Sequence, residues 1–343
     1  MSAERPSERY SRQAMFWAIG PAGQERLRTG SAAVIGCGAL GSATVELLAR
    51  SGVGRITVVD RDFVELSNLQ RQVLFDEADA AAGVPKAIAA AQAVKRINSE
   101  VAVQPLVADV TPDNVEHIVS EVDVVLDGTD NFETRYLVND ACVKLGVPWI
   151  YGGAIGATGM SMTIRPGESP CFRCVFPVSP DPGTMSTCDT AGVLASTVMA
   201  VAAIQWTEAI KILVGDREHL NPGLVGFDLW SNDHLVTKSS RAPDCPCCVQ
   251  KRFAYLEAQV TSRTASLCGR NAIQVSPGHD LKLDLAAMGR RLASAGPVTF
   301  SDFLVRFTVG EYELTIFADG RAIVKGTSDK TVARTLYARY VGT

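Results

Sequence analysis

A glycine-rich hexapeptide lies between an apolar run and a predicted helix near the start of the 343-residue chain. It reads Gly-Cys-Gly-Ala-Leu-Gly and contributes Gly36, Gly38 and Gly41. Glycines let the backbone approach a phosphate closely, and the N-terminus of the following helix favours an anion. Asp60 ends the next apolar run, where a carboxylate can accept hydrogen bonds from ribose hydroxyls. The pattern predicts a nucleotide site. A tight turn alone would use the same glycines, and both NAD and ATP fit.

Polar and basic residues follow this carboxylate closely. Asn68, Arg71 and Gln72 belong to one hexapeptide, and Lys86 stands at the start of a predicted helix. Arginine makes forked contacts to phosphate oxygens, and asparagine supplies a neutral donor. Each basic residue by itself could be a solvated surface charge. Together they favour ATP over a dinucleotide, which needs no such cluster.

A second polar turn follows a predicted buried strand. It reads Asp127-Gly128-Thr129-Asp130-Asn131 and lies at the carboxyl edge of the sheet, where open α/β folds bind ligands. The two carboxylates could hold Mg²⁺ through oxygen ligands. Asp130 or Asn131 could instead cap the next helix, and the two roles can coexist at different residues.

Four of the nine cysteines form two C-x-x-C pairs, Cys171 with Cys174 and Cys245 with Cys248. Four thiolates from two such pairs make a closed tetrahedral Zn²⁺ site. The wide separation of the pairs predicts a clip between two distant loops. An iron–sulfur cluster or a redox pair is the alternative. Cys247 competes within the second pair, but the spacing favours Cys245 with Cys248.

Another cysteine, Cys188, directly precedes an apolar helix predicted over residues 191–214. A helix N-terminus lowers the pKa of a thiol, whereas the neighbouring Asp189 opposes ionisation. A reactive thiolate and an inert buried cysteine are both compatible with this position. Cys37 and Cys142 are predicted to be packing residues.

Alternating strands and helices position these residues in the first half of the chain. This alternation predicts a mostly parallel sheet with helices on both faces. The predicted strands are 31–35, 55–59, 101–107 and 122–126, and the predicted helices are 40–51, 84–98, 112–120 and 133–145. Later strands, the last ones antiparallel, are predicted at 148–151, 158–165, 224–229 and 234–238.

The last part of the chain has a pattern of its own. It predicts strands, two helices and a hairpin that turns at Asp319-Gly320, which together make a small α+β domain. We therefore expect residues 1–257 to form the nucleotide-binding domain and residues 258–343 a C-terminal domain of unknown role.

Composition excludes several classes of function. The net charge of −4 and the lack of a basic block argue against a nucleic-acid partner. The first residues have no apolar core, so a secretory signal is not expected. Residues 190–207 carry no charge but are rich in Ala, Ser and Thr, which favours a buried helix over a membrane span. An odd number of cysteines in a long chain favours the reducing cytoplasm.

This set of motifs resembles the ThiF/MoeB/HesA family, the bacterial relatives of ubiquitin-activating enzymes. The resemblance extends over roughly residues 9–250, with the motifs in the family's order. The matching segments are RYSRQ, GCGALG, VVDRDFVELSNLQRQ, GVPKA, DGTDN, CFRC, TCDTAGVL and CPCC.

The resemblance implies a Rossmann-like mixed sheet in a homodimer. It also implies an enzyme that uses Mg-ATP to adenylate the C-terminal glycine of a ubiquitin-like sulfur-carrier protein, of the ThiS or MoaD type, with a diglycine tail. Pyrophosphate is released, and the carrier is prepared for thiocarboxylate formation in thiamin, molybdopterin or related biosynthesis. The implied roles are ribose binding by Asp60, triphosphate binding by Asn68, Arg71 and Lys86, Mg²⁺ organisation by Asp130, a contact of Arg12 with the partner subunit's ATP, and sulfur transfer by Cys188.

The resemblance has limits. Ala39 replaces a glycine that many relatives have, and the C-terminal part is not a rhodanese domain. A separate sulfur donor, such as a cysteine desulfurase or rhodanese, is therefore expected. Three alternatives stay open: an NAD-dependent oxidoreductase, an enzyme that adenylates a peptide or a tRNA, and a non-catalytic scaffold for a ubiquitin-like protein. The first leaves Arg12, Asn68, Arg71 and Lys86 unexplained.

Overall fold

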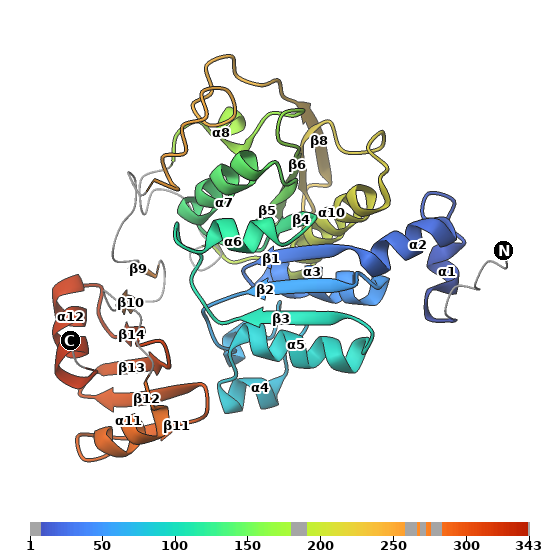
Figure 1. Cartoon of the computed structure of the whole chain (residues 1–343). Helices are drawn as coiled ribbons and strands as arrows, with labels where there is room; N and C mark the ends of the chain where they lie inside the picture. Colours follow the sequence, from blue (N-terminus) through green and yellow to red (C-terminus); the bar gives the residue numbers. More distant parts are fainter. Residues whose placement is uncertain (1–7, 180–190, 258–265, 268–271, 276–282, 342–343) are drawn as a thin grey trace.

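Two β-sheets organise the chain in the computed structural model, which describes residues 8–179, 191–257, 266–267, 272–275 and 283–341 (Figure 1). The larger sheet has eight strands in the order β3-β2-β1-β4-β5-β6-β7-β8. Its strands are β1 (Ser31–Ile35), β2 (Arg55–Val59), β3 (Ala102–Leu106), β4 (Val124–Asp127), β5 (Trp149–Ile155), β6 (Thr158–Ile164), β7 (Gly223–Asp228) and β8 (Asp233–Lys238).

The first five strands are parallel, and β6, β7 and β8 add antiparallel neighbours. This confirms the predicted mixed sheet. Every residue of β1 and β4 is buried, which is why both strands appear in the sequence as continuous apolar runs. The edge strand β8 is exposed along its whole length.

Helices cover both faces of this sheet, as predicted. Side chains of β1 alternate between the faces: Val34 joins the apolar cluster of α3, α5 and α10, whereas Ile35 joins the cluster of α6 and α7. The helices are α3 (Ala39–Ser51), α5 (Lys86–Ile97), α6 (Val115–Ser120), α7 (Phe132–Leu145) and α10 (Ala195–Val214).

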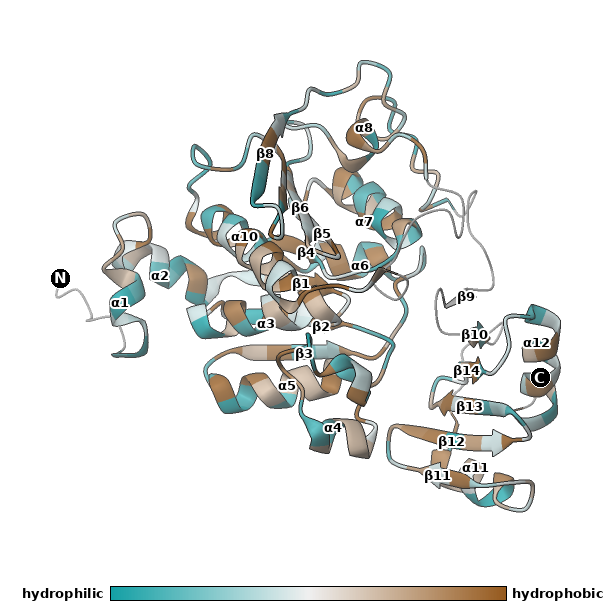
Figure 2. Ribbon diagram, turned by 180° about the vertical axis from the view of Figure 1, so that it is seen from behind, coloured by the Kyte–Doolittle hydropathy of each residue, from teal (hydrophilic) through white to brown (hydrophobic). Residues whose placement is uncertain are grey.

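Helix α10 is the one described helix that is long and apolar enough to cross a membrane. Figure 2 shows it apolar along most of its length. It packs on α2, α3, β4, β5 and β6, and the face with Val198 and Val201 is buried. The helix is therefore a core helix of a soluble fold, as its small residues predicted. It begins later than residue 191 because Leu194 donates its N–H to Gly156 O in an extended bridge (3.0 Å).

Further described helices lie among the strands of this sheet. They were not predicted from the sequence: most are too short for a clear apolar period, and α2, with ten residues, has few apolar ones. They are η1 (Glu8–Tyr10), α1 (Ser11–Ala14), α2 (Gly20–Thr29), η2 (Leu66–Asn68), α4 (Glu77–Ala82) and α8 (Phe172–Val175). Helix α6 is shorter than predicted, because Asn114 Oδ1 accepts a hydrogen bond from Thr111 N (2.9 Å) in a turn that precedes it.

The second sheet is antiparallel and lies near the C-terminus, in the order β11-β12-β13-β14-β10-β9. The predicted hairpin is confirmed: β13 and β14 are joined through Gly320, whose φ of +83° favours glycine. Its elements are β9 (Ser266–Leu267), β10 (Ala272–Val275), α11 (Leu285–Leu292), β11 (Val298–Phe300), β12 (Leu304–Val309), β13 (Tyr312–Phe317), β14 (Ala322–Lys325) and α12 (Lys330–Tyr340).

Candidate nucleotide site and cysteine cluster

Three turns leave the larger sheet side by side. Ile35, the last residue of β1, is in register with Val59 of β2 and with Asp127 of β4. Because these strands are parallel, the segments that begin at Gly36, Asp60 and Gly128 emerge at one edge. The strand order also reverses between β1 and β4, which is where α/β sheets bind ligands.

The glycines of the first turn differ in function: two allow close backbone packing, and one borders open space. Gly36 has a φ of +85°, and a Cβ there would lie 2.7 Å from Gly128 O. A Cβ at Gly41 would lie 1.9 Å from Gly36 O. These two glycines let the turn close against the neighbouring one. A Cβ at Gly38 would meet only Gln72 Nε2, at 3.9 Å, so this glycine borders open space at the N-terminus of α3. A phosphate fits such a place.

Asp60 ties the first two turns together. Its Oδ2 accepts a hydrogen bond from Cys37 N (2.6 Å), and its Oδ1 accepts one from Asp62 N (2.7 Å). Each carboxylate oxygen retains a second lone pair, so the predicted ribose contact is compatible with this geometry. Burial raises the pKa of Asp60, and the Lys86 cation opposes that shift.

Lys86 reaches the site from the first turn of α5. Its side chain is only 4% exposed, and its Nζ lies 3.3 Å from Asp62 Oδ2. Its backbone N–H donates to Asp62 O (2.9 Å). The predicted lysine is thus a buried cation rather than a solvated surface charge. Its partner Asp62, two residues beyond Asp60, was not predicted from the sequence.

The polar cluster after β2 is folded around η2. Asn68 is 1% exposed and accepts from Glu65 N (3.2 Å) in a capping box. Arg71 is half-buried and donates to Ser67 O (2.9 Å). Gln72 is 3% exposed, and its Oε1 has no hydrogen-bond partner among the residues that the structure describes. The Nε2 of the same amide is the atom nearest the open space at Gly38, so a polar side chain borders this space.

In the second polar turn, residues 127–131, the helix cap and the candidate Mg²⁺ ligand are different residues. Asn131, rather than Asp130, caps α7 by accepting from Thr134 N (2.8 Å). Asp127 is 2% exposed and accepts from Thr129 N (2.9 Å). The expectation that both carboxylates of this turn serve Mg²⁺ needs correction, because Asp127 is held inside the fold. Asp130 is exposed and is the carboxylate of the turn that faces outward.

Arg135 is the partner of Asp127 and was not predicted from the sequence. Its Nε donates to Asp127 Oδ2 (2.9 Å), and one terminal nitrogen donates to Thr129 O (2.7 Å). Its guanidinium also lies over the Tyr151 ring, 5.1 Å from the centroid. The sequence offers one indication of this role: Arg135 falls on the side of the predicted helix that faces the core. Its contacts fix the turn that presents Asp130.

Arg12 lies far from these turns in its own chain. It is exposed on α1, and the neighbouring Gln13 donates to Ser51 O at the C-terminal end of α3 (2.9 Å). The nucleotide turns lie at the N-terminal end of α3, so the two places are at opposite edges of the sheet (Figure 1). The structure does not bring Arg12 together with the other predicted residues of the same chain.

The four predicted cysteines do come together. Their sulfur atoms all lie within 4.8 Å of one another, and Sγ–Sγ distances are 3.6 Å for Cys171 with Cys245 and 3.5 Å for Cys174 with Cys248. Four sulfurs at about 2.3 Å from Zn²⁺ would be roughly 3.8 Å apart, so the donor set fits a tetrahedral metal. Cys247 lies outside this cluster and accepts a hydrogen bond from Asn139 Nδ2 (3.2 Å).

The other cysteines have simpler outcomes. Cys37 and Cys142 are fully buried, which agrees with a packing role, and burial raises the pKa of both thiols. Cys188 lies outside the described residues, so its role stays a prediction.

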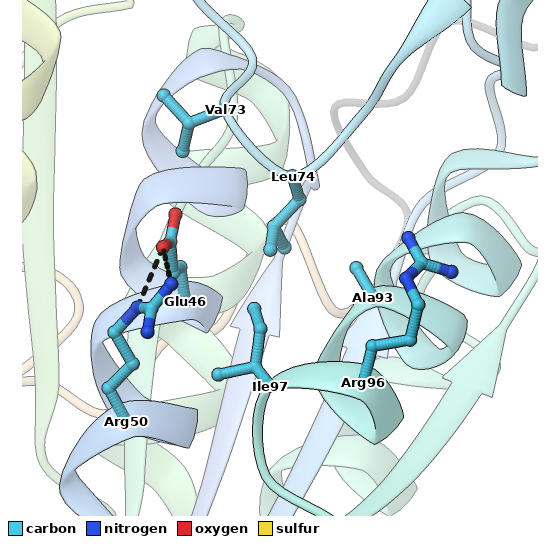
Figure 3. Close-up of a pocket in the computed structure, with 7 residues that line it drawn as sticks. All are labelled: Glu46, Arg50, Val73, Leu74, Ala93, Arg96 and Ile97. Atoms are coloured by element: carbon cyan, nitrogen blue, oxygen red, sulfur yellow. Dashed lines mark hydrogen bonds and ion pairs between the residues drawn. The ribbon is translucent and has the colours of Figure 1, made fainter. Parts of the chain in front are cut away.

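A separate hollow lies between α3 and α5 (Figure 3). It has a volume of about 230 Å³ and contains the ion pair of Arg50 with Glu46 (2.7 Å). Its lining includes Ile97 and Arg96 but none of the predicted site residues. It is not part of the nucleotide site.

Comparison with known proteins gives relatives along the whole chain. The Sulfur carrier protein ThiS adenylyltransferase of Bacillus subtilis (strain 168) is 41% identical over 97% of this chain and 99% of its own length. The SAMP-activating enzyme E1 of Haloferax volcanii is 42% identical over 70% of this chain and 88% of its own length. Among solved structures, E. coli MccB with ATP has a TM-score of 0.62 and 25% identity, covering 71% of this chain and 75% of that one.

The family assignment follows from two independent matches. The profile of the ThiF family matches residues 10–247, which include the three turns and most of the cysteine cluster. The relative from Bacillus subtilis extends the match across the C-terminal sheet. This chain therefore belongs to the ThiF family, and it is an adenylyltransferase.

Proposed function

We propose that this enzyme adenylates the C-terminal glycine of a ubiquitin-like sulfur-carrier protein. The observation that carries the proposal is the meeting of three turns at one sheet edge, with the residue types that ATP requires. Near-full-length similarity to a sulfur-carrier adenylyltransferase supports the choice of substrate. The carrier's terminal carboxylate attacks the α-phosphate of ATP, and pyrophosphate leaves with the electrons of the broken bond.

The residues of the site supply alignment and positive charge. The open face at Gly38 and the N-terminus of α3 receive phosphate oxygens, and Asp60 accepts from the ribose. Lys86, Arg71 and Asn68 bind the triphosphate. Asp130 would hold Mg²⁺, which would neutralise phosphate charge. A carboxylate is already ionised at neutral pH, so the attack needs no protein base and no histidine.

The cysteine cluster serves structure in this proposal. Cys171, Cys174, Cys245 and Cys248 would hold Zn²⁺, which would join α8 to a loop that is distant in the sequence. A closed set of four protein ligands leaves no position for a substrate. The cluster therefore stabilises the fold and takes no part in adenylation.

Two copies of the chain complete the site. Within its own chain, Arg12 lies at the end of the sheet opposite the nucleotide turns and cannot reach phosphates bound there. We therefore assign Arg12 to the ATP of the partner subunit in a homodimer. We place the enzyme in the cytoplasm, with a separate sulfur donor such as a cysteine desulfurase or rhodanese. The boundary of the C-terminal domain near residue 257 is supported by the Haloferax volcanii relative, which covers only 70% of this chain.

Pyrophosphate exchange into ATP tests the substrate directly. We expect exchange to depend on a carrier that ends in diglycine and to disappear with a carrier that lacks the last glycine, because the truncation withdraws the attacking carboxylate by one residue, about 3.5 Å, from the α-phosphate. Exchange that needs no carrier, or that a short peptide supports equally well, would favour peptide adenylation. Binding of NAD in preference to ATP would favour an oxidoreductase.

Replacement of Cys188 should separate the two halves of the pathway. Adenylation forms and breaks no bond to sulfur, so Cys188→Ala should retain carrier-dependent exchange within about twofold of the parent. Formation of thiocarboxylate should fall if the thiolate takes part in sulfur transfer. Both steps are measured on one preparation, with Cys142→Ala as the control. Loss of exchange in a folded variant would contradict the expectation that adenylation needs no thiol. An unchanged yield of thiocarboxylate would contradict a part for Cys188 in sulfur transfer.

A further inference from the structure

The central part of the C-terminal sheet, on β12, β13 and β14, is covered on both faces. Helices α11 and α12 cover one face, where Phe307 and Ile316 belong to the apolar cluster. The opposite face carries Arg306 on β12, Thr315 on β13 and Ile323 on β14, which are in register across the three strands. Thr315 is fully buried there. No described helix of the C-terminal part covers this second face.

The segment after β2 covers it instead. Phe63 is 5% exposed and forms one apolar cluster with Leu304, Phe317 and Ile323 of the C-terminal sheet. The Arg306 guanidinium lies over the Phe63 ring, 4.6 Å from its centroid. The aromatic side chain is thus inserted between the apolar residues and the cations of this sheet face.

Charges around Phe63 are complementary. Lys325 Nζ lies 2.9 Å from Glu65 Oε1, and Arg321 lies 3.5 Å from Asp109 Oδ2. Across this contact the C-terminal part supplies the cations and the larger domain supplies the anions, while Lys325 also lies 3.4 Å from Glu313 Oε1 of its own sheet. The Glu65 side chain is 21% exposed and that of Lys325 is 33% exposed, so the pair is partly shielded from water.

The same segment forms the nucleotide site on its other side. It begins with Asp60, which holds the glycine turn, and continues with Asp62, which holds Lys86. Glu65 then precedes η2: its backbone oxygen accepts from the Asn68 N–H (2.9 Å), and the Asn68 side chain accepts from the Glu65 N–H (3.2 Å). Glu65 therefore contacts Lys325 on one side and Asn68 on the other.

We propose that the C-terminal sheet is a brace that holds the ATP-binding segment in its binding shape. Lys325 is a positioning residue that acts through Glu65 on Asn68, and Phe63 anchors the segment to the sheet. This inference rests on the nucleotide site proposed above. It gives the C-terminal domain a part in ATP affinity, although none of its residues is assigned to the nucleotide.

The test compares two lysine-to-methionine variants of the full chain. Lys325→Met keeps most of the length of the side chain but removes the positive charge that pairs with Glu65. We expect the KM for ATP in carrier-dependent exchange, and the Kd for ATP in a direct binding measurement, to rise about fivefold. The kcat and the KM for the carrier should stay within about twofold. Lys325→Arg should restore ATP affinity. The matched control is Lys330→Met on the exposed start of α12, with no expected effect.

The outcomes separate the brace from the nucleotide site. Folded Lys325→Met with parental KM and Kd for ATP overturns the brace, and so does a loss confined to kcat. If Lys325→Met does not fold, Arg306→Met tests the contact with Phe63 by the same measurements, and unchanged ATP affinity overturns the proposal. Asn68→Ala is measured in parallel. If it leaves ATP binding unchanged, the nucleotide-site assignment itself is wrong; if it weakens binding and both brace variants do not, only the brace fails.

Discussion

Replacement of Arg71 or Asp130 by alanine should lower carrier-dependent pyrophosphate exchange by roughly 100-fold or more, because each group serves charge that concentrates on the phosphates and Mg²⁺ in the transition state. The loss of one preorganised electrostatic contact of this kind costs about 3 kcal/mol. Arg71 is half-buried beside η2, and Asp130 is exposed at the end of a fixed turn, so neither truncation removes a buried packing contact. The fold, the dimer and the bound metal should therefore persist.

Matched controls come from exposed residues of the same types. Arg96→Ala on α5 and Asp113→Ala before α6 remove the same charges away from the three turns, and their exchange rates should equal that of the parent. Near-parental exchange by Arg71→Ala or Asp130→Ala would remove that residue from the catalytic set.

Pyrophosphate exchange by Arg12 variants tests whether Arg12 acts in the site of the partner subunit. Arg12→Ala should also be inactive, yet mixing it with inactive Arg71→Ala should restore exchange. Each mixed dimer then holds one site with both arginines and one site with neither. Random subunit exchange gives half mixed dimers, so activity should recover to about a quarter of the parental value. No recovery after confirmed subunit exchange would mean that Arg12 does not act across the dimer.

Loss of one cysteine ligand should remove the metal and destabilise the fold. The purified chain should carry about one Zn²⁺. Cys171→Ser should lose it and lower the free energy of unfolding by at least about 3 kcal/mol, or roughly 4–6 °C in Tm, because the cluster clips distant loops together. Exchange activity per folded molecule should change much less, since the cluster takes no part in adenylation.

Metal analysis and thermal unfolding on the same sample measure this effect. Cys247→Ser is the matched control, because Cys247 is buried beside the cluster but is not one of its four donors. It should retain the metal. A folded parental protein without metal and with four free thiols at these positions would end the proposal of a structural zinc site.

Much of the larger sheet could be predicted from the sequence, for a physical reason. A parallel strand covered on both faces is mostly apolar instead of alternating, so the short runs SAAVI and RITVV predicted the bounds of β1 and β2, 31–35 and 55–59. Glycine turns and helix starts are equally local, since Gly36 needs a positive φ and Pro85 fixes where α5 can begin. The short helices α1 and α4 lack such a signal.

Residue types and spacing also determined which chemistry the site could perform. They predicted the nucleotide turns and the four cysteine donors, because both depend on short motifs. The roles within the DGTDN turn could not be assigned in this way. Arg135 lies one helix turn into α7 and decides by its ion pair that Asp127 is structural, and only the folded chain shows that contact.

The tertiary structure alone decided what the C-terminal part touches. In the sequence, Arg306, Thr315 and Lys325 occupy the polar positions of alternating strands, a pattern typical of a face toward solvent. In the fold, that face is buried against Phe63 and Glu65, which are distant in the sequence. The alternation of polar and apolar residues shows which residues share a face of a strand. It does not show what covers that face, because long-range packing brings the covering segment there.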